Sequence, residues 1–302
     1  MKHIFIVNPA AGKKDHTGEV SRHIQEICRE MGLEFAIYKT SRPGHATELV
    51  QQIAGAEPEK HFRFYACGGD GTLNEVVNGI SKVDNAAFTN FPMGTGNDFI
   101  RYFGADAEKF RDIRALIEGE EHPIDYIEST ELDSVNIVSA GIDARIADGK
   151  SRYRMIGSGM APYLCSTLEH VIRGIGEPLE VRVDGVNYDG DYTMICLTNG
   201  LYYGGGFNPA PEARIADGEL ELLLVKKITR ARVPGVILKY KEGRYKELPD
   251  LITCLHPKEV RIRALDGGMT VNFDGETRVV PEITFRLSDR RIPLILPKGV
   301  RP

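Results

Sequence analysis

The first 120 residues alternate between short apolar runs and segments with helical spacing. The apolar runs are typical of strands and cover residues 3–7, 33–39, 61–66 and 86–91. Between them, apolar residues recur every three or four positions, as they do between residues 73 and 80. This alternation predicts an α/β domain with a doubly wound, mostly parallel sheet.

From about residue 123 the pattern changes to many short strands. Strand-like runs cover residues 124–127, 134–138, 179–183, 192–197, 220–225, 259–264, 269–273 and 282–287. Asp-Gly pairs separate several of these runs and favour hairpin turns, and a helical insertion is expected at residues 153–173. The pattern predicts domains over residues 1–122 and 123–302. The second is a mainly antiparallel β-sandwich whose extreme C-terminus is free to return to the first domain.

Composition and charge narrow the class of protein. The 302 residues are 42% hydrophobic and 27% charged, which is ordinary for a globular protein. The formal net charge of −5 argues against nucleic acid as a partner. Five scattered cysteines without a Cys-x-x-Cys pair fit a reducing cytosol. Because no apolar run approaches the roughly 18 residues that span a bilayer, we expect a soluble protein whose membrane contact is peripheral.

A glycine-rich turn, Gly68-Gly69-Asp70-Gly71-Thr72, lies between a predicted strand and a predicted helix. Glycine lets the backbone approach a ligand, and the N–H groups at a helix start favour an anion such as phosphate. The Asp70 carboxylate would repel a phosphate unless Mg²⁺ lies between them or the carboxylate acts on a proton. The turn therefore indicates a nucleotide enzyme, and the alternative is a tight turn with Asp70 as the helix N-cap.

Two further loops follow predicted strands. The first is Asn8–Lys14, and the second is Gly94-Thr95-Gly96-Asn97-Asp98. In the second loop, Thr95 could donate a hydrogen bond to a phosphate, and Asp98 is expected to cap a helix that extends to Tyr102. The carboxyl ends of parallel strands meet at one edge of the sheet, where open α/β sheets bind ligands. The loops together predict a nucleotide pocket.

The second predicted domain carries acids in turns. Asp274-Gly275-Glu276 follows a strand, and it is either a hairpin turn or a turn that presents Glu276 as a general base in an interdomain cleft. The segment 214–220 could place one carboxylate and backbone carbonyls around Mg²⁺, or form a plain β-turn. We interpret the glycine-rich segment 199–206 as a backbone bend that lines a pocket.

Residues 226–246 contain eight Lys or Arg and one acid, Glu242. The favoured interpretation is a solvated helix face, and the alternative is a patch that meets anionic lipid headgroups.

Several sequence motifs follow one another in a fixed order along the chain. They are Asn8-Pro9-x-x-Gly12, Thr40 with Pro43-Gly44-His45-Ala46, Gly68-Gly69-Asp70-Gly71-Thr72-x-Asn74-Glu75, Pro92-x-Gly94-Thr95-x-Asn97-Asp98-Phe99, Asn199-Gly200 with Gly204-Gly205-Gly206, Asp217-Gly218 and Asp274-Gly275-Glu276. With them, the sequence resembles soluble bacterial lipid kinases that have the diacylglycerol kinase catalytic domain and are related to sphingosine kinases. The glycine-aspartate turn alone would resemble NAD kinases and phosphofructokinases as well.

The resemblance implies an N-terminal domain of NAD kinase and diacylglycerol kinase type. The residues that it implies for ATP binding are Asn8, Pro9, Ala10, Ala11, Gly12, Thr40, Gly68, Gly69, Asp70, Gly71, Thr72, Gly94 and Thr95. It implies Glu276 as the proton acceptor, and we expect the charge of Asp70 to assist it. It also implies a Mg²⁺ held by Asp217 with the backbone carbonyls of Arg214 and Glu219.

We therefore expect ATP-dependent phosphorylation of a diacylglycerol-like lipid hydroxyl, with Mg²⁺, in the cleft between the two domains. Such an enzyme would serve lipid metabolism and phospholipid biosynthesis from the cytoplasm, peripherally at the inner membrane face. An exposed sheet edge would permit a homodimer. The alternatives are an NAD kinase-like enzyme and a nucleotide-binding regulator without transfer activity.

Overall fold

The computed structural model describes residues 1–12, 15–149 and 175–302, so the helix expected at residues 153–173 lies outside the described residues. The described residues form two compact units. The first unit comprises Met1–Ile124 and Arg290–Pro302, and the second unit comprises Asp125–Asp289.

The first unit is built on a six-stranded sheet with the order β2-β1-β3-β4-β17-β5. Its strands are β1 (Lys2–Val7), β2 (Phe35–Lys39), β3 (Phe62–Gly68), β4 (Ala86–Pro92), β5 (Glu120–Ile124) and β17 (Ile292–Leu296). Neighbouring strands from β2 to β17 are parallel, and β5 runs antiparallel to β17. The predicted mostly parallel sheet is confirmed.

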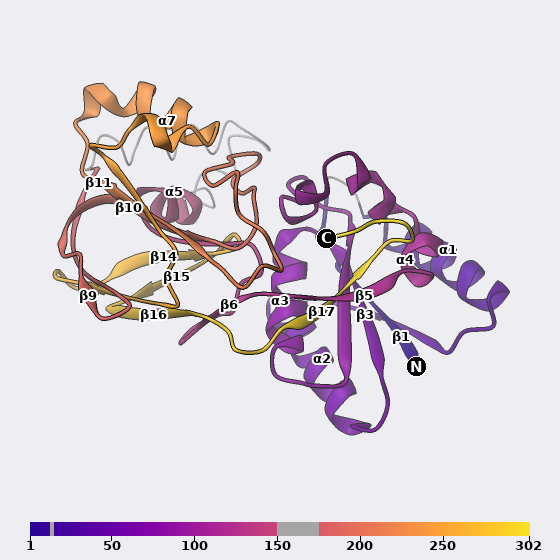
Figure 1. The fold of residues 1–302 in the computed structure, drawn as a ribbon. Helices are drawn as coiled ribbons and strands as arrows, with labels where there is room; N and C mark the ends of the chain where they lie inside the picture. Colours follow the sequence, from indigo (N-terminus) through magenta and orange to yellow (C-terminus); the bar gives the residue numbers. More distant parts are fainter. Residues whose placement is uncertain (13–14, 150–174) are drawn as a thin grey trace. The chain divides into compact units, whose positions relative to one another are not determined.

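Helices cover both faces of this sheet. They are α1 (Thr17–Glu30), α2 (His45–Ala56), α3 (Asp70–Ile80), the 3-10 segment η1 (Phe99–Arg111) and α4 (Ile113–Ile117). Figure 1 shows α2 and α3 on one face and α1 and α4 on the other, which confirms the doubly wound arrangement. Because both faces are covered, the central strands are apolar on both sides, and Ile4 to Val7 are at most 1% exposed.

Two predicted elements of this region are wrong in detail. The helix expected after Asp98 is a 3-10 segment, interrupted at Gly104 (φ 54°, ψ −122°). The run at 124–127 is not one strand, because β5 ends at Ile124 and β6 (Ile127–Ser129) belongs to the second unit. Between them, Asp125 donates its backbone N–H to the Ile215 carbonyl (2.7 Å), so the chain leaves the first sheet there.

The second unit is an antiparallel sheet with the strand order β15-β14-β7-β10-β8-β13-β16-β6. Off this path, β11 pairs with β10, β12 pairs with β11, and β9 pairs with β8. The strands after β6 are β7 (Ile137–Gly141), β8 (Glu177–Val183), β9 (Val186–Asn187), β10 (Gly190–Thr198), β11 (Glu221–Lys226), β12 (Ile252–Leu255), β13 (Glu259–Ala264), β14 (Met269–Phe273), β15 (Glu276–Val280) and β16 (Glu282–Leu287). The sheet curls on itself as a β-sandwich-like half-barrel, so the predicted fold class is confirmed.

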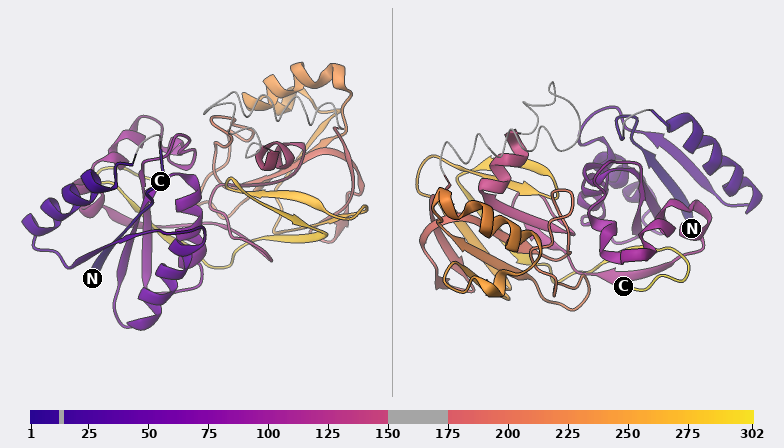
Figure 2. Two further views of the ribbon diagram at one scale, coloured as in Figure 1. Left: turned by 180° about the vertical axis from the view of Figure 1, so that it is seen from behind. Right: turned by 90° about the horizontal axis from the view of Figure 1, so that it is seen from above.

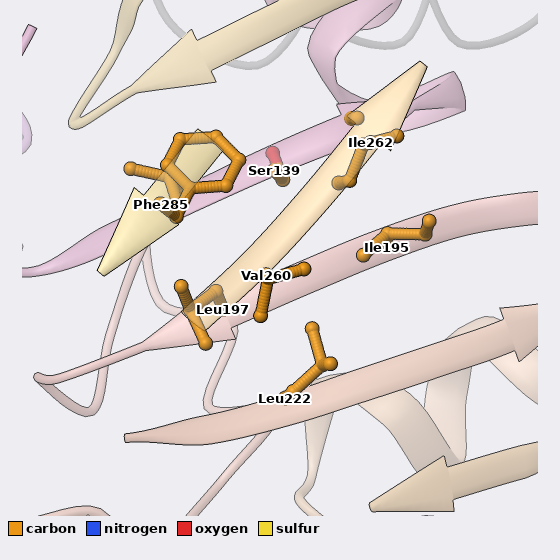
Figure 3. Close-up of a pocket in the computed structure, with 9 residues that line it drawn as sticks. Ser139, Ile195, Leu197, Leu222, Val260, Ile262 and Phe285 are labelled. Atoms are coloured by element: carbon orange, nitrogen blue, oxygen red, sulfur yellow. The ribbon is translucent and has the colours of Figure 1, made fainter. Parts of the chain in front are cut away.

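Two apolar clusters lie on the two faces of this curled sheet. The inner one joins Val260 and Ile262 of β13 to Ile195 and Leu197 of β10, and Figure 3 shows these side chains packed in the interior. The outer one is covered by α5 (Ile142–Gly149) and α7 (Val233–Lys241), which lie on the same face in Figure 2. Short 3-10 segments, η3 (Arg230–Arg232) and η4 (Tyr245–Glu247), flank α7.

None of the helices in the described part of the chain combines the length and apolar character needed to cross a membrane.

Candidate functional site

Three loops meet at the carboxyl edge of the first unit's sheet, because β1, β3 and β4 are parallel neighbours. Asn8, just after β1, donates its backbone N–H to the Cys67 carbonyl (3.0 Å) and its side-chain Nδ2 to Thr72 Oγ1 (2.9 Å). Met93, just after β4, donates its N–H to the Gly68 carbonyl (2.8 Å). The structure therefore brings together the loops that were predicted to bind phosphate.

Glycines allow these loops to approach one another closely. Gly12 has a left-handed φ of 82°, and a Cβ there would lie 2.7 Å from the Met93 carbonyl oxygen. A Cβ on Gly94 would lie 2.5 Å from the Gly69 Cα. Any larger residue at these positions would force the loops apart, so the backbone N–H groups remain close to a common place.

Asp70 joins the glycine turn to the Gly94–Asp98 loop. Its Oδ2 accepts the Asn97 backbone N–H and its Oδ1 accepts that of Asp98, both at 2.8 Å. Gly69, not Asp70, is the N-cap of α3, so the N-cap alternative for Asp70 is wrong. Burial, and then the nearby charge of Asp98, raise the pKa of the Asp70 carboxyl to about 6.

The Asp98 side chain does not cap η1 by a hydrogen bond, so the predicted capping role is wrong. It lies 3.3 Å from Arg101 Nε instead. Gly96 in the same loop has a specific reason to lack a side chain, because a Cβ there would lie 2.6 Å from Asp70 Oδ2. The loop is shaped around the Asp70 carboxylate.

The remaining residues expected to bind ATP lie near these loops or on their surface. Thr40 donates its backbone N–H to the Val7 carbonyl (3.0 Å), which places it directly beside the end of β1. Ala10 and Ala11 donate to the side chain and carbonyl of Asn8 (2.9 and 3.1 Å), forming a compact turn. Thr95 is exposed.

Glu75 is a positioning residue to which the sequence pattern assigned no role. Its carboxylate accepts the backbone N–H groups of Gly44 (2.9 Å) and Ala46 (3.0 Å) at the start of α2. Thr47 Oγ1 donates to the Glu75 carbonyl (2.7 Å). These bonds hold the segment after Thr40 against α3. The sequence feature that could have identified Glu75 is its place in the motif directly after Gly68–Thr72. Its hydrogen-bond partners are identified only by the fold.

In the second unit, the motif residues gather at one edge of the sheet. Thr198, at the end of β10, pairs with Ile137 at the start of β7 and with Glu221 at the start of β11. Phe273, at the end of β14, pairs with Val138 and with Glu276 at the start of β15. The Asn199, Asp217 and Asp274 loops therefore lie around the same edge.

Glu276 is half-buried and begins β15 directly after the Asp274-Gly275 turn. Both turn residues have a positive φ, 50° and 103°, so the predicted hairpin turn is present as a two-residue type I′ turn. The general-base role remains a prediction. Glu276 and Asp70 belong to different units, and the predicted cleft between domains also remains a prediction.

The loop expected to hold Mg²⁺ folds as a tight turn. Asp217 Oδ1 accepts the Glu219 backbone N–H (3.0 Å), and Arg214 donates its guanidinium to the Ala213 carbonyl (2.7 Å). The carboxyl of Glu221 is nearby, and burial followed by the charge of Asp217 raises its pKa to about 7. Excess negative charge and oxygen donors suit a hard cation.

No group of three or more His, Cys, Asp or Glu side chains converges as a metal site in the described ranges. The expected Mg²⁺ site needs only one carboxylate, because two of its three donors are backbone carbonyls.

Asn199 is fully buried and joins several of these segments. Its Nδ2 donates to the carbonyls of Asp125 (2.9 Å) and Val135 (2.7 Å). The Asp125 carboxylate in turn accepts the backbone N–H of Gly218 (2.7 Å) in the Asp217 loop. The sequence marked Asn199 only as part of a backbone bend, and its bracing role depends on residues more than 60 positions away.

A second buried carboxyl, Asp143 in α5, was not singled out by the sequence. Tyr203 Oη donates to Asp143 Oδ2 (3.2 Å) and lies 3.2 Å from Tyr240 Oη. Burial raises the pKa of Asp143 to about 6. Tyr240 belongs to the outer apolar cluster and Tyr203 packs against it, so these bonds link α5 and α7 to the glycine-rich segment.

The basic stretch at 226–246 is compensated by acids from neighbouring segments. The ion pairs are Lys227–Asp191, Arg232–Asp250, Lys239–Glu247, Arg244–Glu247 and Lys246–Glu212. Its net charge is therefore smaller than the local sequence suggests. Helix α7 also exposes Ile237 (36%) and Leu238 (54%).

Known families match both parts of the chain. Residues 2–129 match the diacylglycerol kinase catalytic domain, and residues 136–296 match the YegS C-terminal NAD kinase beta sandwich-like domain. The chain belongs to this diacylglycerol kinase-like lipid kinase family.

Relatives and solved structures are similar over nearly the full length. The diacylglycerol kinase of Bacillus subtilis (strain 168) is 28% identical over 301 residues, covering 97% of this chain and 96% of that protein. The diacylglycerol kinase of Staphylococcus carnosus (strain TM300) is 27% identical, covering 98% and 95%. A crystal structure of a diacylglycerol kinase from Bacillus anthracis str. Sterne has a TM-score of 0.71 at 20% identity, covering 99% of this chain and 98% of that one, and shows the same fold.

Proposed function

We propose that this protein is an ATP-dependent lipid kinase that transfers the γ-phosphoryl group to a hydroxyl of a diacylglycerol-like lipid. One observation carries the proposal. The loops after β1, β3 and β4 are joined by hydrogen bonds at the carboxyl edge of the first sheet, with Asp70 bound to the backbone of the third loop. Such a convergence of glycine-rich loops beside a helix N-terminus suits a triphosphate.

The site residues divide the work between binding and proton transfer. Backbone N–H groups of the Gly68–Thr72 and Gly94–Thr95 segments hold the phosphates. The Asn8–Gly12 turn borders them, because its Asn8, Ala10 and Ala11 N–H groups already bond within the protein, and Thr40 lies beside it. Glu276 accepts the proton of the lipid hydroxyl while that oxygen attacks the γ-phosphorus. The bond to the β-γ bridging oxygen breaks and ADP leaves. Little covalent chemistry is required, because phosphoryl transfer depends mainly on positioning and charge neutralisation.

Asp217 and the carbonyls of Arg214 and Glu219 are the proposed ligands of Mg²⁺. When bound, this ion supplies positive charge at the edge that also carries the Asp274-Gly275-Glu276 turn.

The test is a phosphorylation assay with purified protein and labelled ATP. A panel of short-chain diacylglycerols, other lipid alcohols and NAD is offered separately, and products are identified by mass. We expect a phosphorylated diacylglycerol, with Glu276→Gln as the control that lacks it. Phosphorylation of NAD alone would favour the NAD kinase-like alternative. ATP binding without transfer to any acceptor would favour the nucleotide-binding regulator.

The proposed substrate lies in a membrane, so the enzyme has to reach a lipid surface. We place it in the cytoplasm, peripherally at the inner membrane face, where it needs no nucleic acid partner and can form a homodimer. The exposed Ile237 and Leu238 of α7, next to Lys241, suit insertion among anionic headgroups.

Sedimentation with anionic vesicles tests this contact. We expect Leu238→Asp to lower binding and Leu265→Asp, at a similarly exposed position (52%), to leave it unchanged. Equal binding by both variants would remove α7 from this role.

A further inference from the structure

The Asp274 side chain is bound more extensively than a hairpin turn requires. Its Oδ1 accepts the Ile137 backbone N–H (2.7 Å) and its Oδ2 accepts that of Val135 (3.0 Å). The Asp274 N–H donates to the Ile137 carbonyl (3.1 Å). The turn is therefore joined to the start of β7, almost 140 residues earlier in the chain.

Turn geometry alone does not explain an aspartate here. The position needs a left-handed φ of 50°, which asparagine adopts at least as readily in a type I′ turn. An asparagine amide, however, has one oxygen, and its NH₂ group would face the second backbone N–H. Only a carboxylate accepts both bonds, and charge-assisted bonds of this kind are the stronger ones.

These bonds determine the position of Glu276 at the start of β15. Glu276 follows Asp274 after a single residue, Gly275, whose N–H is held by Asn272 Oδ1 (2.9 Å). The pairing of Glu276 with Phe273 in the β14–β15 hairpin depends on the same turn. A loosened turn would let the Glu276 carboxylate move relative to the sheet edge.

We propose that Asp274 is a positioning residue, which holds the Glu276 carboxylate in place through its two bonds to the backbone of Val135 and Ile137. The proposal rests on the proposed kinase function, in which Glu276 accepts the proton. Both oxygens of the Asp274 carboxylate are bound to backbone N–H groups, so we assign it a role that acts through Glu276. A displacement of the order of 1 Å in a catalytic group costs about 100-fold in rate. Loss of the Asp274 carboxylate is therefore expected to lower the rate strongly even if Glu276 moves only slightly.

The same unit contains a control turn of the same length. Asp184-Gly185 is also a two-residue turn, with φ values of 48° and 82°, between β8 and β9. The Asp184 Oδ1 accepts two backbone N–H groups, those of Lys258 (3.0 Å) and Glu259 (2.8 Å). No residue of the candidate site lies in this hairpin.

The experiment compares Asp274→Asn, Asp184→Asn and Glu276→Gln in the full-length protein. Each is assayed for kcat, for KM of ATP and lipid, for thermal stability and for amide exchange at Val135 and Ile137. We expect Asp274→Asn to lower kcat about 10- to 100-fold with an unchanged KM for ATP, and to speed exchange at the two amides. Asp184→Asn should keep the wild-type kcat and lose less stability, because the single amide oxygen of asparagine can still accept both N–H groups there.

The double variant Asp274→Asn/Glu276→Gln separates positioning from a merely structural role. If Asp274 acts through Glu276, the double variant is no slower than Glu276→Gln alone. An active wild-type enzyme with the same kcat in Asp274→Asn and Asp184→Asn overturns the positioning role only. A wild-type protein that phosphorylates no lipid overturns the proposed function itself.

Discussion

Asp70 in the first unit and Asp274 in the second use the same device in different surroundings. Each carboxylate accepts two backbone N–H groups from a segment distant in sequence. Asp70 begins a helix and lies close to the Asp98 carboxylate, whereas Asp274 has a left-handed φ in a hairpin turn. The first therefore shapes a loop whose backbone is proposed to bind the nucleotide, and the second shapes the turn that carries the proposed proton acceptor. Disturbing the two should affect different kinetic constants.

The largest effect should come from the side chain that the second turn presents. Glu276→Gln removes the proposed proton acceptor and keeps the size of the side chain. We expect turnover to fall by roughly 10²- to 10⁴-fold, the usual contribution of a general base. ATP affinity, measured by isothermal titration calorimetry, should be unchanged, because the loops proposed to bind the phosphates belong to the first unit. Near-normal turnover would remove Glu276 from the role.

Changing the first turn should act on nucleotide binding. Asp70→Asn leaves one acceptor oxygen for two N–H donors, so the Gly94–Asp98 loop loses a charge-assisted bond worth about 1.5–3 kcal/mol. We expect ATP affinity to fall by about 10- to 100-fold by calorimetry. Asp106→Asn, at an exposed ion pair with Lys109 in η1, is the control and should bind ATP normally. A variant with full ATP affinity and lost turnover would instead give Asp70 a direct role in catalysis.

A smaller effect is expected one turn further along α3. Glu75→Gln weakens the hold on Gly44 and Ala46, and through them on the segment after Thr40. We expect a several-fold weaker ATP affinity and a lower melting temperature. Glu48→Gln, which removes only an exposed ion pair with Arg42, should change neither. Unchanged ATP affinity in Glu75→Gln would separate Thr40 from the nucleotide site.

The smallest effect is a pH dependence that belongs to the Asp70 turn. The pKa of the Asp70 carboxyl is about 6 in the folded protein, against an ordinary value of 3.8. Between these two pH values the folded state therefore binds more protons than the unfolded chain. The Asp70 contribution therefore lowers stability as pH rises from about 4 to 6.

The pH effect is measured as a difference in melting temperature between wild type and Asp70→Asn. We expect this difference to change by a few degrees Celsius across that range. The buried acids Asp143 and Glu221 have raised pKa values in both proteins, so their contributions cancel. A difference that is constant with pH would contradict the buried, ionisable Asp70.

Much of the architecture could be predicted because its causes are local. Strands β13, β14 and β16 have the predicted bounds, since alternating apolar residues bounded by turn residues specify a strand wherever it packs. Strands β5, β9, β12, β15 and β17 were not predicted. In the last case, the reason is that β17 joins the first sheet only after the whole second unit has been completed.

The net charge of the stretch at 226–246 could not be predicted from the local sequence either. Counting residues within it finds one acid, yet acids from residues 191, 212, 247 and 250 neutralise much of it in the folded protein. Ion pairing depends on which segments become neighbours, and composition carries no information on that.

By itself, the sequence determined the α/β and antiparallel classes and the glycine turns that follow the strands, because hydrophobic period and backbone freedom are properties of a few adjacent residues. Tertiary structure alone decided that Asp70 binds the backbone of Asn97 and Asp98, and that Asp274 binds that of Val135 and Ile137. A carboxylate can accept any nearby N–H group, so its partners are settled only when packing brings distant segments of the chain together.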